Sequence, residues 1–136
     1  MTLILVAEDE PPVREIIVRV LERAGHRVHP VADGESALRA VREHRPDLVL
    51  TDVDMPLING FLLCDEIRRD PESANVPVVL VTGLVDPGDL RAVEVGASAV
   101  LAKPFTGPQL LAMVAEYLPA AGVAGHGGPR GAPGDG

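Results

Sequence analysis

The sequence predicts an α/β domain in which short strands alternate with helices around a parallel sheet, and three observations predict this class. Short runs rich in Val, Leu and Ile recur along residues 1–118. Runs of about four to eight apolar residues are typical of strands that are covered on both faces. Segments with apolar residues at spacings of three and four separate these runs, as in amphipathic helices. The strict alternation of the two patterns implies a parallel, doubly wound sheet with helices on both faces.

The first strand and the first helix show the two patterns most clearly. Leu3–Ala7 is an unbroken apolar run. Pro11 and Pro12 suit the first turn of the helix that follows, and Gly25 suits its C-terminal stop. The apolar face of this helix consists of Val13, Ile16, Ile17, Val20, Leu21 and Ala24, and its polar face consists of Arg14, Glu15, Arg19, Glu22 and Arg23.

The rest of the domain repeats the alternation. In chain order, we expect a strand at Arg27–Ala32, a helix at Gly34–His44, a strand at Leu48–Thr51, a helix at Gly60–Arg69, a strand at Val76–Thr82, a helix at Pro87–Val95, a strand at Ala99–Ala102 and a helix at Pro108–Leu118. The helical stripes are Ala37, Leu38 and Val41, then Phe61, Leu63, Cys64 and Ile67, and finally Leu110, Leu111, Val114 and Leu118.

The composition changes at Pro119. The segment 119–136 holds 7 of the 14 glycines and 3 prolines in 18 residues. Such a segment buries too little apolar surface to offset the conformational entropy that ordering would cost. We therefore expect one domain over residues 1–118, followed by a flexible tail or a truncated linker over residues 119–136.

Charge and composition exclude several classes of function. The formal net charge is −8 and aromatic residues make up 2% of the chain, so we expect no nucleic-acid binding, which needs neutralised phosphates or stacking platforms. A single cysteine, Cys64, excludes an internal disulfide and a thiolate-rich zinc site. The apolar runs are far shorter than a membrane span, and the N-terminus lacks the features of a signal peptide. We expect a cytoplasmic protein that does not bind membranes.

Polar and charged residues follow four of the expected strands: Glu8-Asp9-Glu10, Asp52 with Asp54, Thr82-Gly83, and Lys103-Pro104. Because the carboxyl ends of parallel strands meet at one edge of a sheet, we expect these groups to converge there. Carboxylates so close together disfavour ionisation unless a cation is present. Mg²⁺ suits such a site, because it accepts one or two carboxylates and often bridges to a phosphoryl group.

The chemistry indicated by these residues is phosphoryl transfer to a carboxylate. Asp52 would be the nucleophile and would form an aspartyl phosphate. Lys103 and the metal would neutralise charge on the transferring group, and Thr82 would donate its hydroxyl to a phosphoryl oxygen. Lys103 is the only lysine among 12 basic residues, which favours a site that requires a compact ammonium instead of a guanidinium fork.

The motifs at these strand ends resemble the receiver domain of two-component response regulators over about residues 2–118. The matching residues are Glu8-Asp9, Asp52-Val53-Asp54-Met55-Pro56 with Gly60, Thr82-Gly83, Gly96-Ala97-Ser98-Ala99 and Lys103-Pro104-Phe105. The resemblance implies a flavodoxin-like fold with strand order 2-1-3-4-5, and it implies that Asp52 is the phosphoacceptor.

The resemblance also implies a ligand set for Mg²⁺. Asp9 and Asp52 would bind the ion directly, Glu8 would bind it through water, and the backbone carbonyl of Asp54 would be a further ligand. The peptide bond between Lys103 and Pro104 is expected to be cis. One position departs from the family pattern, because Val100 stands where relatives usually have Tyr or Phe.

The resulting interpretation is a phosphorylation-activated signalling switch in a two-component phosphorelay. It would catalyse only its own phosphorylation and dephosphorylation and is therefore not predicted to be an enzyme with a separate substrate. The phosphoryl donor would be a sensor histidine kinase or a phosphotransfer protein, and the output would be a downstream protein target. The domain would be a monomer or a phosphorylation-dependent homodimer.

Two alternatives remain open from the sequence. A receiver-like interaction module that works without phosphorylation is the first, since Val100 offers no ring to move. The second is a haloacid-dehalogenase-like phosphatase, whose Asp-x-Asp motif resembles Asp52 and Asp54. That family needs an acidic pair after the lysine, whereas only Glu116 and Asp135 follow Lys103 here.

Overall fold

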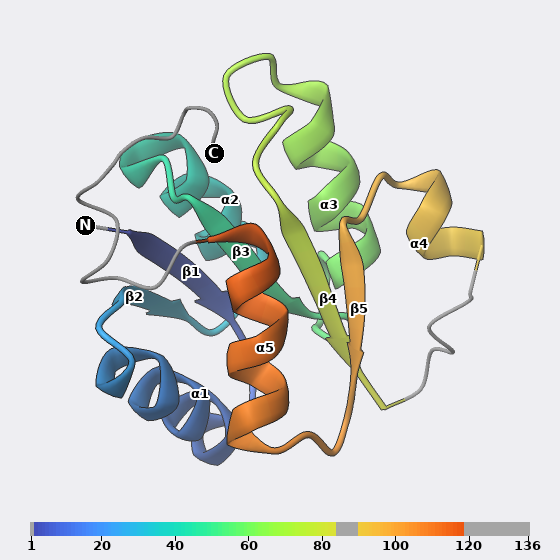
Figure 1. Ribbon diagram of the computed structural model, residues 1–136. Coiled ribbons are helices and arrows are strands. Elements are labelled where there is room, and N and C mark those ends of the chain that lie inside the picture. Colours follow the sequence, from blue (N-terminus) through green and yellow to red (C-terminus); the bar gives the residue numbers. More distant parts are fainter. Residues whose placement is uncertain (1, 84–89, 119–136) are drawn as a thin grey trace.

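The computed structural model describes residues 2–83 and 90–118, and within them five strands alternate with five helices (Figure 1). The elements in chain order are β1 (Leu3–Ala7), α1 (Pro11–Arg23), β2 (Arg27–Val31), α2 (Gly34–His44), β3 (Leu48–Asp52), α3 (Gly60–Arg69), β4 (Val78–Thr82), α4 (Leu90–Glu94), β5 (Ala99–Ala102) and α5 (Gly107–Tyr117). The predicted tail, 119–136, and the predicted start of the fourth helix lie outside the described residues.

All strand pairs are parallel, and the strand order is β2-β1-β3-β4-β5. The predicted fold class and strand order are therefore confirmed. The predicted bounds of β1, α2, α3 and β5 match the observed ones, and the other predicted bounds that fall on described residues differ by one or two residues. β4 begins at Val78 instead of Val76, because Pro77 has no N–H to donate to the ladder. The cis peptide bond between Lys103 and Pro104 is also present.

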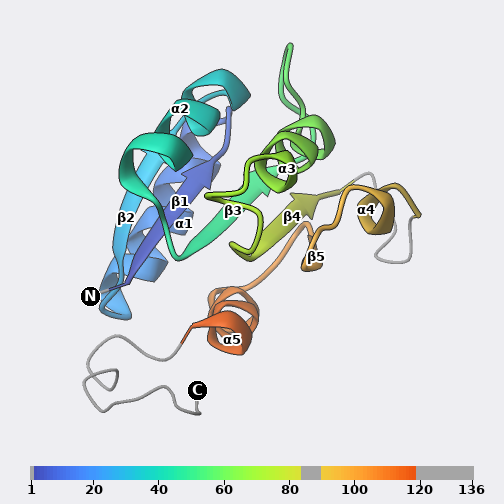
Figure 2. The ribbon, with the colours of Figure 1, turned by 90° about the horizontal axis from the view of Figure 1, so that it is seen from above.

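Helices cover both faces of the sheet (Figure 2), and the core forms two clusters of buried residues, one on each face. Successive residues of a strand point to opposite faces. Leu5 and Ala7 of β1 accordingly pack with α2, α3 and α4, whereas Ile4 and Val6 pack with α1 and α5. Every residue of β3 and β4 is buried, which explains why both strands are apolar up to the polar residues at their carboxyl ends.

Helices α3 and α5 begin beside the carboxyl ends of the strands that precede them. The Asn59 side chain accepts a hydrogen bond from the backbone N–H of Leu62 at 2.9 Å. Thr106 and Gln109 form a reciprocal capping box at the start of α5. Side chains of this kind satisfy N–H groups that a first helical turn leaves unpaired. The loops after β3 and β5 are therefore anchored close to the sheet edge.

Gly60, the first residue of α3, lies against the end of β3. A Cβ atom at this position would be 2.5 Å from the carbonyl oxygen of Asp52 and 2.8 Å from the Cα of Val53. The backbone N–H of Gly60 also donates to the carbonyl of Val53 at 3.0 Å. The absence of a side chain therefore sets how closely α3 approaches the strand end that carries Asp52.

None of the helices within residues 2–83 and 90–118 is both long enough and apolar enough to cross a membrane.

Candidate functional site

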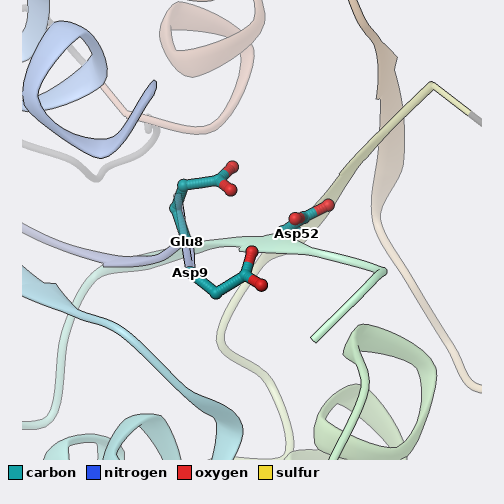
Figure 3. Close-up of side chains that lie close together, drawn as sticks. All are labelled: Glu8, Asp9 and Asp52. Carbon is teal, nitrogen blue, oxygen red and sulfur yellow. The ribbon is translucent and has the colours of Figure 1, made fainter. Parts of the chain in front are cut away.

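The carboxyl edge of the sheet brings the predicted site residues together. Glu8 and Asp9 follow β1, and Asp52 is the last residue of β3. Each of these three side chains has a carboxylate oxygen within 4.8 Å of the other two, and Figure 3 shows them close together. Glu8 and Asp52 are 1% and 4% exposed, whereas Asp9 is half-buried. The site therefore combines two carboxylates shielded from water with a third that solvent reaches.

Lys103 supplies the positive charge of the cluster. Its Nζ lies 3.2 Å from Oε1 of Glu8 and 3.5 Å from Oδ1 of Asp52. The backbone N–H of Lys103 donates to the carbonyl of Thr82 at 2.9 Å, which places the end of β5 beside the end of β4. Thr82 is itself 1% exposed. All four predicted strand ends thus meet, and one ammonium group is shared between two buried carboxylates.

The turns that follow β1 and β3 hold these carboxylates in place. The backbone N–H of Glu10 donates to Oε2 of Glu8, and the backbone N–H of Asp54 donates to Oδ1 of Asp52, both at 3.3 Å. Asp54 itself is exposed. Val100 is half-buried and packs against the core layer formed by α2, α3 and α4, so no aromatic ring occupies that position.

The charges in the cluster shift one another's pKa values. Burial, reinforced by the charge of Asp52, raises the pKa of Glu8 from 4.5 to about 7. Burial also raises the pKa of Asp52, although Lys103 opposes that shift. The pKa of Lys103 is raised as well, because the attraction of Asp52 and Glu8 outweighs the cost of burying its charge. The carboxylates of the cluster therefore outnumber the single ammonium group that neutralises them.

In EDTA, which removes bound metal, the free energy of unfolding of the protein is expected to fall as the pH rises from about 4.5 through 7. Because the pKa of Glu8 is higher in the folded state than in the unfolded state, the fold favours the protonated carboxyl. This contribution to stability is complete below pH 4.5 and is lost as the pH rises through about 7. The change is at most about 3 kcal/mol. The measurement is urea unfolding in EDTA at pH 5 and pH 8. The free energy of unfolding of Glu8→Gln, relative to that of the wild type, should be higher at pH 8 than at pH 5. A difference between the two proteins that is the same at both pH values would contradict this expectation.

The site has the donors and the space that a hard divalent cation requires. An open depression of about 230 Å³ is lined by Asp9, Glu10, Asp52, Asp54, Gly83 and Lys103. Oε1 of Glu8 is buried and has no hydrogen-bond partner among the described residues, since its contact with Lys103 is an ion pair without hydrogen-bond geometry. Three grouped carboxylates that share one ammonium group leave an excess of negative charge, which suits Mg²⁺.

One contact at this site does not follow from the sequence pattern. The helical periodicity places Arg14 on the polar face of α1, but its Nη1 donates a hydrogen bond to the backbone carbonyl of Glu8 at 2.8 Å. No spacing rule predicts this bond, because it depends on how the turn between β1 and α1 folds back on the helix.

Comparison with known proteins assigns the chain to a family. Residues 4–115 match the family described as the response regulator receiver domain. The DNA-binding response regulator MtrA of Mycolicibacterium smegmatis is 40% identical over 116 residues, which cover 85% of this chain and 50% of MtrA. The transcriptional regulatory protein AfsQ1 of Streptomyces coelicolor is 38% identical over 119 residues, which cover 87% of this chain and 52% of AfsQ1. The chain thus spans about half the length of these relatives.

Solved structures agree with the sequence matches. The chemotaxis protein CheY4 of Vibrio cholerae superposes with a TM-score of 0.82 and 29% identity, covering 87% of this chain and 99% of CheY4. The receiver domain of the sensor histidine kinase PA1611 from Pseudomonas aeruginosa has a TM-score of 0.79 and 32% identity, covering 85% of this chain and 96% of that domain. That structure has a magnesium ion coordinated in its active-site cleft.

Proposed function

Since the chain belongs to the response regulator receiver domain family of two-component systems, we propose that it is a switch that is activated when Asp52 accepts a phosphoryl group. One observation carries this proposal. The Asp52 carboxylate lies at the sheet edge, 3.5 Å from the Lys103 ammonium and beside two further carboxylates, and it lines an open depression. Asp9 lacks the ammonium contact, and Glu8 does not line the depression, so Asp52 combines both properties.

The proposed reaction moves one phosphoryl group. An oxygen of Asp52 attacks phosphorus, the new oxygen–phosphorus bond forms, and the bond from phosphorus to the donor atom breaks with its electron pair left on the donor. Lys103 lies within 3.5 Å of Asp52 and would neutralise charge that develops on the phosphoryl oxygens. Thr82 ends the neighbouring strand, from which its hydroxyl would donate to a phosphoryl oxygen.

The residues that would hold Mg²⁺ are Asp9, Asp52, Glu8 and the backbone carbonyl of Asp54. The grouped carboxylate oxygens support this assignment, as does Oε1 of Glu8, which is buried and accepts no hydrogen bond from the described residues. The magnesium ion in the PA1611 receiver domain supports it by similarity. When bound, the ion would offset the repulsion between the carboxylates and the incoming phosphoryl group.

We further propose a sensor histidine kinase or a phosphotransfer protein as the donor, with a downstream protein as the target. Two relatives are named as DNA-binding regulators, and the matched segment covers about half of each. The acidic balance of the chain, with a net charge of −8, makes the receiver domain itself a poor surface for nucleic acid.

The test is intact mass spectrometry after incubation with acetyl phosphate and Mg²⁺. We expect the wild type and the control Asp65→Asn to gain one phosphoryl group, and Asp52→Asn to gain none. Asp65 is a suitable control because its carboxylate lies on α3, where it pairs with Arg69. Omitting Mg²⁺ should also prevent the gain in mass.

Rapid hydrolysis of the phosphoprotein would hide the product, so beryllofluoride binding is measured on the same sample. If the wild type neither gains mass nor binds beryllofluoride with Mg²⁺, the phosphorylation proposal is wrong. The domain would then be better explained as an interaction module that works without phosphorylation.

A further inference from the structure

Arg14 links helix α1 to the backbone of the turn between β1 and α1. It is half-buried, and its Nη1 donates to the carbonyl oxygen of Glu8 at 2.8 Å. Hydrogen bonds from a charged donor are stronger than those between neutral groups. The guanidinium therefore holds a peptide group that neither β1 nor α1 would hold through its own ladder or helix bonds.

Four hydrogen bonds fasten the turn between β1 and α1, and one of them is the bond from the Glu10 backbone N–H to Oε2 of Glu8. The backbone N–H of Glu8 donates to the carbonyl of Val31 at the end of β2, at 3.1 Å. The backbone N–H of Arg14 donates to the carbonyl of Glu10 at 2.9 Å, and its side chain donates to the carbonyl of Glu8. The bond from the Arg14 backbone is the first helical bond of α1 and does not depend on the side chain. The guanidinium is therefore the side-chain group of Arg14 that holds the start of the Asp9 segment, through the Glu8 carbonyl.

A held carbonyl restrains the position from which the next side chain projects. The peptide group is planar, so the carbonyl of Glu8 and the Cα of Asp9 lie in one rigid unit. Fixing the orientation of that carbonyl therefore fixes where the Cα–Cβ bond of Asp9 begins. Asp9 is the least buried of the three clustered carboxylates, and core packing restrains it least.

We propose that Arg14 is a positioning residue for the cation site, acting through the Glu8 carbonyl to orient the Asp9 carboxylate. This inference rests on the proposed function, since it assumes that the site takes Mg²⁺. Mg²⁺ demands near-octahedral geometry and loses water reluctantly, so it is sensitive to the direction of each ligand. Groups that orient metal ligands typically change metal affinity by about 10–100-fold when they are removed.

A purely electrostatic role for Arg14 predicts the opposite sign. A positive charge near the cluster repels a cation, so removal of that charge alone would tighten Mg²⁺ binding. The positioning role predicts weaker binding on removal of the hydrogen bond. The direction of the change in affinity therefore separates the two roles.

The experiment is an isothermal titration of Mg²⁺ into the wild type, Arg14→Met, Arg14→Lys and Arg19→Met. We expect the dissociation constant to rise on the order of tenfold in Arg14→Met. Arg14→Lys should bind within about threefold of the wild type, because lysine keeps one charged donor. Arg19→Met removes the same charge from an exposed position of the same helix and should leave Mg²⁺ affinity unchanged.

A second readout does not need the metal. In ¹H–¹⁵N spectra recorded in EDTA, Arg14→Met should move the amide resonances of Asp9 and Glu10, and Arg19→Met should leave them in place. If Arg14→Met unfolds, Arg14→Gln replaces it. Unchanged or tighter Mg²⁺ binding in folded Arg14→Met, or in Arg14→Gln if the methionine variant unfolds, would overturn the inference, and so would unmoved Asp9 and Glu10 resonances in that variant. Failure of the wild type to bind Mg²⁺ would instead contradict the proposed function.

Discussion

Lys103→Met is expected to slow phosphorylation by acetyl phosphate by on the order of a hundredfold or more. The ammonium lies 3.2 Å from Glu8 and 3.5 Å from Asp52, and methionine keeps the apolar stem without the charge. Removing one preorganised charge or donor that stabilises a transition state commonly costs about 10²–10³ in rate. The rate is measured by intact mass spectrometry at fixed Mg²⁺ and acetyl phosphate.

The same variant should be less stable than the wild type near pH 8. Glu8 and Asp52 would remain buried together without their shared counter-charge, so the loss should shrink at pH 5, where Glu8 is protonated. Arg39→Met serves as the control, because the Arg39 side chain is 60% exposed and makes a surface ion pair at 4.0 Å. If Lys103→Met is phosphorylated as fast as Arg39→Met, the ammonium plays no part in the transfer.

Gly60→Ala is expected to lower the free energy of unfolding by about 1–3 kcal/mol or more, and to impair phosphorylation as well. The new Cβ would lie 2.5 Å from the carbonyl oxygen of Asp52 and 2.8 Å from the Cα of Val53. Both neighbours are backbone atoms, so α3 or the end of β3 must move to accept it. Urea unfolding gives the change in stability, and the acetyl phosphate assay gives the change in function.

Gly107→Ala is a matched control for this substitution. Gly107 is also the first residue of a capped helix, α5, but a Cβ there would meet only the methyl groups of Val20 at 3.8 and 3.9 Å. We expect this variant to match the wild type or to gain slightly, because alanine reduces the freedom of the unfolded chain. Equal stability losses in the two variants would show that the contact with Asp52 is not the cause.

Much of the fold can be predicted from local pattern alone. Two helices, Gly34–His44 and Gly60–Arg69, occur with the predicted bounds, because apolar stripes and flanking glycines define them locally. β4 begins later than predicted, because an apolar run does not show that Pro77 cannot donate a ladder hydrogen bond.

The sequence by itself determined which residues end the strands, and therefore that Glu8, Asp9, Asp52 and Lys103 meet at one edge. This follows from parallel topology, which places all the carboxyl ends on the same side of the sheet. The order of the strands came from resemblance to a family, and the structure agrees with it.

Only the tertiary structure decided how those groups face one another. Three features depend on register and packing between segments that are distant in the sequence. They are the burial of Glu8 and Asp52, the ammonium group shared between these two side chains, and the close approach of Gly60 to the Asp52 carbonyl. The bond from Arg14 to the Glu8 carbonyl depends likewise on the path of one turn. Sequence periodicity reports which face of an element is buried, whereas distances between side chains arise when elements far apart in the chain pack together.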